Sequence, residues 1–305
     1  MSQPDIPFPD SPVIPNMVEG THVIEFSCHK GISCWNACCS NIDISLTPYD
    51  VLRMKRHLGI TSTEFLKDYT VPYEMEKDGI AGVKFRPIED GTACRFMKPE
   101  GCEIYESRPT ACRYYPVALL SMRKQDEYID RDSYAIVKED HCKGHEVKRS
   151  ITIADYRKEQ GLEEYDDLAR GWRQLVLKKK SSGPTIGKPT LRSRQLFFMA
   201  CYDIDRFREF VSSDSFAKLF DLPEAEKDAL ASDEALMQFA FRFLRQVMFG
   251  EESIALNSEA AQERLAKVQE KRLIEEREAA KRRANEAEEN LMDEGEESLA
   301  GRKPG

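Results

Sequence analysis

The segment 28–39 reads CHKGISCWNACC and contains four cysteines within twelve residues. A second cysteine group lies in CRFMKPEGCEIYESRPTAC, at 94–112. Only Cys201 of the nine cysteines lies outside the stretch 28–142. Cysteines that serve as small core hydrophobes do not cluster in this way, so the pattern predicts metal binding or redox chemistry. The eight candidate ligands are Cys28, Cys34, Cys38, Cys39, Cys94, Cys102, Cys112 and Cys142.

Two kinds of metal suit these thiols. Iron–sulfur clusters are commonly held by four thiolates, and structural zinc also takes four cysteines. The spacings C-x5-C-x3-C-C and C-x7-C-x9-C lack the paired CxxC knuckles of a zinc ribbon. We therefore expect an iron–sulfur cluster, of the [4Fe–4S] type, with zinc as the alternative.

The vicinal pair Cys38–Cys39 raises a geometric question. Neighbouring side chains in an extended backbone point to opposite sides, so both thiols bind one metal only if the loop bends. The pair either serves two centres or includes a thiol that is not a ligand. We expect the two cysteine groups to converge in space, with Cys142 returning to the same site.

Two arginines and the ninth cysteine are considered beside the eight candidate ligands. Arg108 and Arg113 lie on either side of Cys112. In the second coordination shell, their positive charges would offset the negative charge of a thiolate-bound cluster. The alternative is that they form surface ion pairs. Cys201 lies in the apolar run LFFMACYDIDRF and is predicted to be a buried core residue.

Capping motifs locate the helices near the cysteines. Thr47, Pro48 and Asp50 predict the start of a helix that ends at Gly59. Thr61 begins a second helix, to about residue 69, and a short helix is expected to carry Cys112. A short strand is predicted at 42–44, where apolar residues alternate. A strand and turn are expected at 80–90, and further strands at 117–122 and 134–138.

The chain is expected to have an α+β fold in four parts. An extended proline-rich arm covers 1–22, and a cysteine-rich domain of short strands, loops and helices covers 23–150. A helical region follows at 151–258, with two or three amphipathic helices between 190 and 250. The last part, 259–305, contains 13 acidic and 10 basic residues and is predicted to be a charged helical tail.

Composition limits the function classes. The net charge of −9 argues against nucleic-acid binding. The sequence contains no apolar run long enough to span a membrane. The N-terminal segment lacks the features of a secretory signal, which favours a cytoplasmic location. Common nucleotide-binding and hydrolase motifs are absent as well, so the catalytic residues, the substrate and any protein partner stay unknown.

The stretch 28–142 resembles the YkgJ-type cysteine-cluster family, whose CxxCxxCC domain is described as zinc- or iron-chelating. The resemblance rests on FSCHKGISCWNACC at 26–39, ISLTPYDVLRMKRHLGI at 44–60 and CRFMKPEGCEIYESRPTACRYYP at 94–116. The flagellin lysine methylases have a similar opening and a similar ending. The resemblance therefore implies a metal or iron–sulfur protein, and it implies that some relatives are enzymes.

Three functions follow as expectations. The first is an iron–sulfur protein with a redox role. The second is a zinc-stabilised module that binds a partner protein through its helical tail. The third, implied by the resemblance alone, is a protein-lysine methylase-like enzyme.

Overall fold

The computed structural model describes residues 13–75, 80–122, 131–181 and 190–257, and isolated residues between 259 and 280. The chain divides into two compact units. The larger contains 1–212 and 223–254, and the smaller contains 213–222 and 255–305. The four-part organisation expected from the sequence stays a prediction. Pro4, Pro7, Pro9 and Pro12 of the expected arm, and most of the expected tail, lie outside the described residues.

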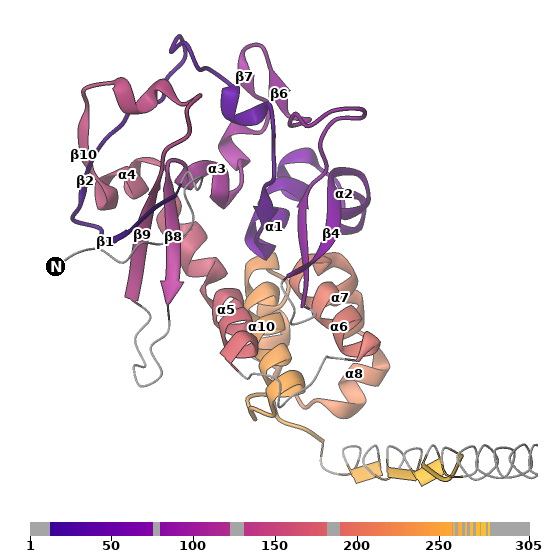
Figure 1. Ribbon diagram of the computed structural model, residues 1–305. Helices are drawn as coiled ribbons and strands as arrows, with labels where there is room; N and C mark the ends of the chain where they lie inside the picture. The colour runs from indigo at the N-terminus through magenta and orange to yellow at the C-terminus, as the bar shows by residue number, and fades with distance from the viewer. Residues whose placement is uncertain are drawn as a thin grey trace, which may run out of the picture. The chain divides into compact units, whose positions relative to one another are not determined.

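The sheets of the larger unit are small and antiparallel (Figure 1). One has the order β1-β9-β8, and another has the order β3-β5-β4. Strands β2 and β10 form a two-stranded sheet, and β6 and β7 form a hairpin. The bounds are β1 Val13–Val18, β2 Val23–Glu25, β3 Ser45–Leu46, β4 Thr70–Met75, β5 Ile80–Phe85, β6 Met97–Lys98, β7 Gly101–Cys102, β8 Val117–Met122, β9 Arg131–Val137 and β10 Ser150–Thr152.

Helices supply the rest of the described structure, which confirms the α+β prediction. The α-helices are α1 Pro48–Leu58, α2 Ser62–Tyr69, α3 Thr110–Tyr114, α4 Ile153–Glu159, α5 Leu162–Ser181, α6 Leu191–Tyr202, α7 Ile204–Val211, α8 Asp214–Leu219, α9 Glu224–Ala229 and α10 Asp233–Phe249. Three 3-10 turns lie near the cysteines: η1 Ala37–Cys39, η3 Tyr105–Ser107 and η4 Lys143–Glu146.

The predicted helix caps are present. The Thr47 side chain accepts from the backbone N–H of Asp50, and the Asp50 carboxylate accepts from the N–H of Thr47. Gly59 ends α1 with a φ of 67°, a left-handed conformation that glycine adopts without steric cost. Thr61 and Glu64 form the same reciprocal pair at the start of α2. These local motifs fix the two ends of α1, a helix that helps to position the cysteine region.

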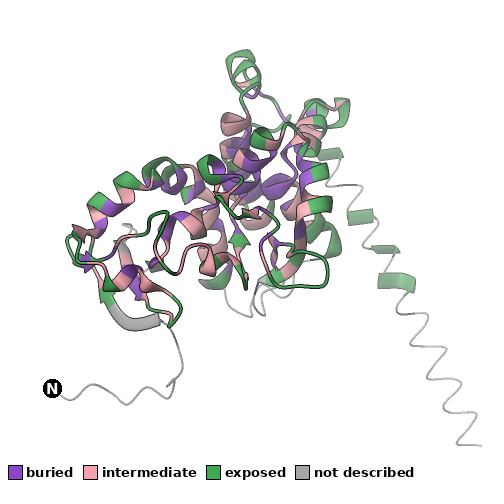
Figure 2. Ribbon diagram, turned by 90° about the horizontal axis from the view of Figure 1, so that it is seen from above, coloured by how far each residue is buried: buried purple, intermediate pink, exposed green. Residues whose placement is uncertain are grey.

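A helical core of α1, α5, α6, α7 and α10 forms the most deeply buried part of the larger unit. Phe207, Phe239 and Phe243 are each at most 2% exposed, and the ring of Phe207 lies 5.7 Å from that of Phe243. Figure 2 shows buried segments gathered where these helices pack. A second apolar cluster, which includes Phe26, Tyr114 and Ile153, lies under the sheets that precede α5.

Two predicted elements differ from the structure. The strand expected at 42–44 forms at Ser45–Leu46 instead, because β5 pairs with those residues. The region 190–250 contains five helices, α6–α10, rather than two or three. Polar caps divide it: Asp203 separates α6 from α7, and Ser213 and Ser232 cap α8 and α10.

The smaller unit contains α8 and the isolated bridge between Phe220 and Leu256. The rings of Phe216 and Phe220 stack within it at 4.5 Å. In the described part of the chain, no helix has the length and apolar character of a membrane span.

Candidate metal centre

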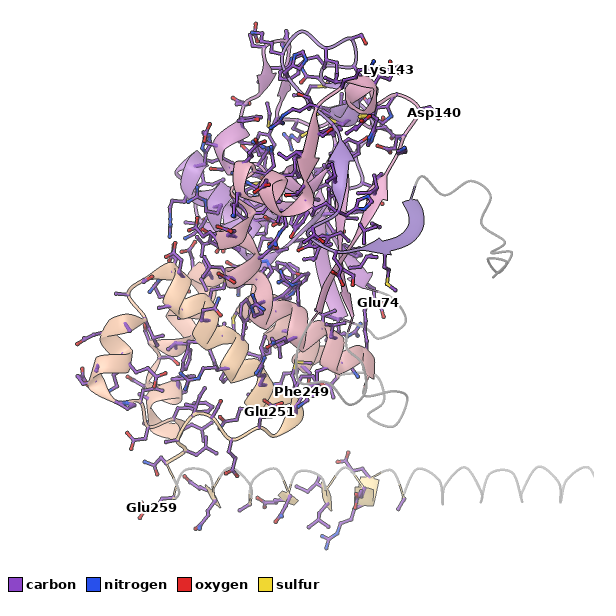
Figure 3. The ribbon with its side chains drawn as sticks, turned by 90° about the vertical axis from the view of Figure 1, so that its left-hand side faces the viewer. Glu74, Asp140, Lys143, Phe249, Glu251 and Glu259 are labelled. Carbon is purple, nitrogen blue, oxygen red and sulfur yellow. The ribbon has the colours of Figure 1, made fainter. Side chains whose placement is uncertain are left out.

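The first cysteine loop is anchored at its beginning by the segment that follows Cys142. The backbone N–H of Phe26 donates to Arg149 at 3.0 Å, and that of Ser27 donates to Gly144 at 3.1 Å. The backbone N–H of Lys143 donates to the Cys34 sulfur at 3.2 Å. Figure 3 shows Lys143 at the opposite end of the larger unit from Phe249. These bonds bring Cys142 to the cysteine loop across more than a hundred residues.

The end of the same loop is anchored by the second cysteine group. The backbone N–H of Cys94 donates to the carbonyl of Cys39 at 2.8 Å, and that of Ile42 donates to Thr92 at 2.9 Å. The Asn36 side chain donates to the carbonyl of Lys98 at 2.8 Å. The two cysteine-bearing segments therefore lie against each other at these points. That their sulfurs converge on one metal site stays a prediction.

The vicinal pair lies in a bend. Asn36 has a left-handed φ of 64°, a conformation that asparagine tolerates better than most residues, and it precedes the turn η1. The Cys38 and Cys39 sulfurs are 4.0 Å apart. The backbone is therefore not extended here, and the two neighbouring sulfurs lie close together.

The second group is held by a hairpin and a short helix. Met97 pairs with Cys102 across β6 and β7. Cys112 lies on α3, whose first residue, Thr110, donates both its N–H and its hydroxyl to the Asp50 carboxylate, at 2.8 and 2.7 Å. Asp50 is 0% exposed. One buried carboxylate thus caps α1 and also fixes the helix that carries Cys112.

The thiols interact electrostatically. Burial and the negative charges of Cys38, Cys34 and Cys142 raise the pKa of Cys28 to about 11. Burial first, and then the charges of Cys94, Cys102 and Cys38, raise the pKa of Cys112. The pKa of Cys38 falls to about 7 because the Cys39 thiol donates a hydrogen bond to it. All eight thiols are linked by such interactions.

This donor set fits a thiophilic cation. Each thiolate disfavours ionisation of its neighbours, and a bound metal ion reverses that effect. Backbone N–H groups also point at sulfur: those of Phe96 and Met97 partly offset the rise that burial causes in the pKa of Cys94. Among the described residues, no three His, Cys, Asp or Glu side chains lie at the spacing of a single bound ion.

The clustered cysteines range from exposed to buried, whereas Cys201 lies in the core. Cys28 and Cys38 are exposed, whereas Cys94 is 8% exposed. Cys201 is 2% exposed within α6, and burial raises its pKa well above the usual value. Cys201 is a core residue, as the sequence predicts.

The two arginines differ in what they contact. The charge of Arg108 lowers the pKa of both Cys28 and Cys102, against the upward effect of burial. The Arg113 guanidinium donates to the carbonyls of Arg108, Gln160 and Glu106 and stacks on Tyr165, with 4.4 Å to the ring centre. Arg108 thus provides charge near the thiols, and Arg113 holds the loop that carries Arg108.

Several residues of this region carry no ligand motif in the sequence. Burial, and after it the neighbouring Cys142 and Glu139, raise the pKa of Tyr115. Asn36 and the backbone of Lys143 lock the loop, and Asp50 locks α3. Of these residues, only Asp50 is marked in the sequence, by the capping motif of α1. That motif does not reveal that Asp50 also contacts Thr110.

Residues 27–143 match a family model described as "CxxCxxCC: Putative zinc- or iron-chelating domain". This match confirms the family resemblance for a little over a third of the chain. No curated protein and no solved structure matches the chain. The expected link to flagellin lysine methylases therefore receives no support.

Proposed function

We propose that residues 27–143, which form a domain of the CxxCxxCC zinc- or iron-chelating family, carry an iron–sulfur centre with a redox role. The observation that carries the proposal is that hydrogen bonds hold the chain segments of Cys34, Cys39, Cys94 and Cys142 against one another. Thiolates are the principal ligands of such clusters. We also propose a cytoplasmic location, where the reducing thiol pool would keep the clustered cysteines free to bind metal.

The surroundings of the thiols suit a redox centre. Backbone N–H groups directed at sulfur and a nearby guanidinium tune the reduction potential of iron–sulfur clusters. Here the N–H of Lys143 bonds to Cys34, and the Arg108 charge acts on Cys28 and Cys102. Two exposed cysteines, Cys28 and Cys38, give an electron donor or acceptor a short path to the centre.

The experiment is metal analysis and absorption spectroscopy of anaerobically purified protein. We expect a brown protein with iron, acid-labile sulfide and broad visible absorption that bleaches on reduction. The Cys112→Ser variant should lose metal, whereas Cys201→Ser should match the wild type, because Cys201 lies in the core. A colourless protein that contains zinc and no sulfide would contradict the proposal and favour the zinc-stabilised module.

A further inference from the structure

The geometry points to Gly144 as a positioning residue, whose missing side chain lets Phe26 hold the segment of Cys142 against the first cysteine loop. A β-carbon added at Gly144 would lie 2.4 Å from Cε2 of the Phe26 ring, 3.0 Å from Cδ2 and 3.1 Å from Cζ. Contacts that short are not tolerated in a packed interior. The inference rests on the proposed function in one respect, because it takes Cys34 and Cys142 as ligands of the metal centre.

The role of Gly144 comes from its size and not from its backbone conformation. Gly144 does not have the positive φ that glycines such as Gly59 adopt, so alanine suits its backbone. Gly20 is a matched position, since it also lacks a positive φ. A β-carbon at Gly20 would lie 3.8 Å from that of Ala154, an ordinary packing distance. The two glycines therefore differ in the space beside them.

The Phe26 ring is held on several sides. It is 2% exposed, and its centre lies 5.2 Å from the ring of His145 and 6.0 Å from the ring of Tyr156. The backbone N–H of Phe26 donates to the carbonyl of Arg149 at 3.0 Å, next to the pairing of β2 with β10 (Figure 1). A methyl group at Gly144 would therefore displace the turn η4 rather than the ring.

The turn η4 provides the contacts that bring Cys142 to the cysteine loop. The carbonyl of Gly144 accepts from the N–H of Ser27 at 3.1 Å, and the N–H of Lys143 donates to the Cys34 sulfur at 3.2 Å. Cys142 directly precedes η4 and packs against the apolar cluster that contains the ring. A displaced turn would therefore move Cys142 and the N–H of Lys143 away from Cys34.

The test compares Gly144→Ala with Gly20→Ala in the full-length protein purified anaerobically. In Gly144→Ala we expect metal release to a chelator to be about tenfold faster than in the wild type, because overpacking strains the contact beside the ligands. The amide of Lys143 should also exchange hydrogen faster, while the amides of α10 keep their protection, as a local change requires. Gly20→Ala should match the wild type in all three measurements.

Removal of the Phe26 ring should relieve the effect of the added methyl group. Valine has none of the three ring atoms near the added β-carbon, so Phe26→Val with Gly144→Ala should release metal as fast as Phe26→Val alone. This pair also decides the matter if Gly144→Ala alone does not fold, and the comparison with Gly20→Ala decides it if Phe26→Val does not fold. An equal effect of Gly144→Ala with and without the ring would overturn the inference.

The outcomes separate this inference from the proposed function. If the wild type contains zinc without sulfide, the iron–sulfur proposal fails, and the release rates still test Gly144. If the wild type contains no metal, hydrogen exchange at Ser27 and Lys143 still compares the variants. An iron–sulfur protein in which Gly144→Ala behaves like Gly20→Ala would support the proposed function and overturn the inference.

Discussion

The cysteine loops and the helical core of the larger unit are held together by different forces. The cysteine loops, 28–39, 94–112 and 139–146, are joined mainly by backbone hydrogen bonds, and η1 contains no buried residue. In the helical core, α10 alone buries seven residues: Leu236, Met237, Phe239, Ala240, Phe241, Phe243 and Leu244. Apolar burial stabilises the core, whereas we expect the loops to need metal–thiolate bonds in addition.

That difference assigns separate roles to the two regions. Metal–thiolate bonds would add folding free energy to the cysteine loops, which also bury Phe96 and Ile104. The core provides the rigid base: Asp50 on α1 holds the helix of Cys112, and Arg113 packs on Tyr165 of α5. Damage to the core should therefore reduce stability, and damage to the loops should reduce metal binding.

The largest effect is expected in the core. Phe243→Ala removes a ring that is 2% exposed and packs on Phe207 and Phe210, both at 5.7 Å. We expect the free energy of unfolding to fall by about 3–5 kcal/mol, measured by denaturant titration. Val247→Ala, on the same helix at a position 47% exposed, is the control and should change it little. Equal losses in the two variants would contradict a packed core at this position.

A smaller effect is expected where the two regions meet. Asp50→Asn keeps the volume but replaces one of the two acceptor oxygens by an NH2 group, so either the bond from Thr47 or the pair from Thr110 is lost. We expect a loss of about 1–3 kcal/mol in denaturant titration, together with weaker metal retention, because this carboxylate links α1 to the helix of Cys112. The exposed Asp68→Asn is the control. Normal metal retention in a destabilised Asp50→Asn protein would show that α3 does not need the clamp.

Acid should weaken the contact of α1 with α10. The hydrogen bond from Arg56 lowers the pKa of Glu234 below its usual 4.5, despite some desolvation. A lowered pKa in the folded state means that the carboxylate adds stability above that value and loses it as the pH falls. The melting temperature should therefore drop between about pH 5 and pH 3, and less steeply in Glu234→Gln. Identical pH profiles would exclude a role for this pair.

The smallest effect is expected at the C-terminal end. Described residues there are exposed, such as Leu273 at 55% and Ile274 at 49%. Deleting 259–305 should leave the melting temperature and the metal content nearly unchanged, as measured by calorimetry and metal analysis. A large loss of either would mean that this segment supports the larger unit.

Local signals account for the parts of the fold that the sequence predicts. The Thr47 and Thr61 caps and the end at Gly59 depend on neighbouring residues only, and the structure contains all of them. The expectation that the two cysteine groups lie close together follows from chemistry, because the ligands of one metal site must meet.

The missed features depend on tertiary contacts. The strand near 45 is set by its partner β5, and the bend at Asn36 is fixed by a bond to Lys98. Nothing local marks Asp50 as the acceptor for Thr110, sixty residues away. Sequence reasoning therefore finds candidate ligands and helix ends, but not the contacts that position them.

Hydrogen exchange with and without metal tests the central claim most directly. Amides of the cysteine loops, including those of Cys94 and Lys143, should be protected in the metal-loaded protein and exchange rapidly after anaerobic chelation. Amides of α10 should keep their protection in both states. Unchanged protection of the loops after complete metal removal would contradict the account, because the loops would then be stable without the metal.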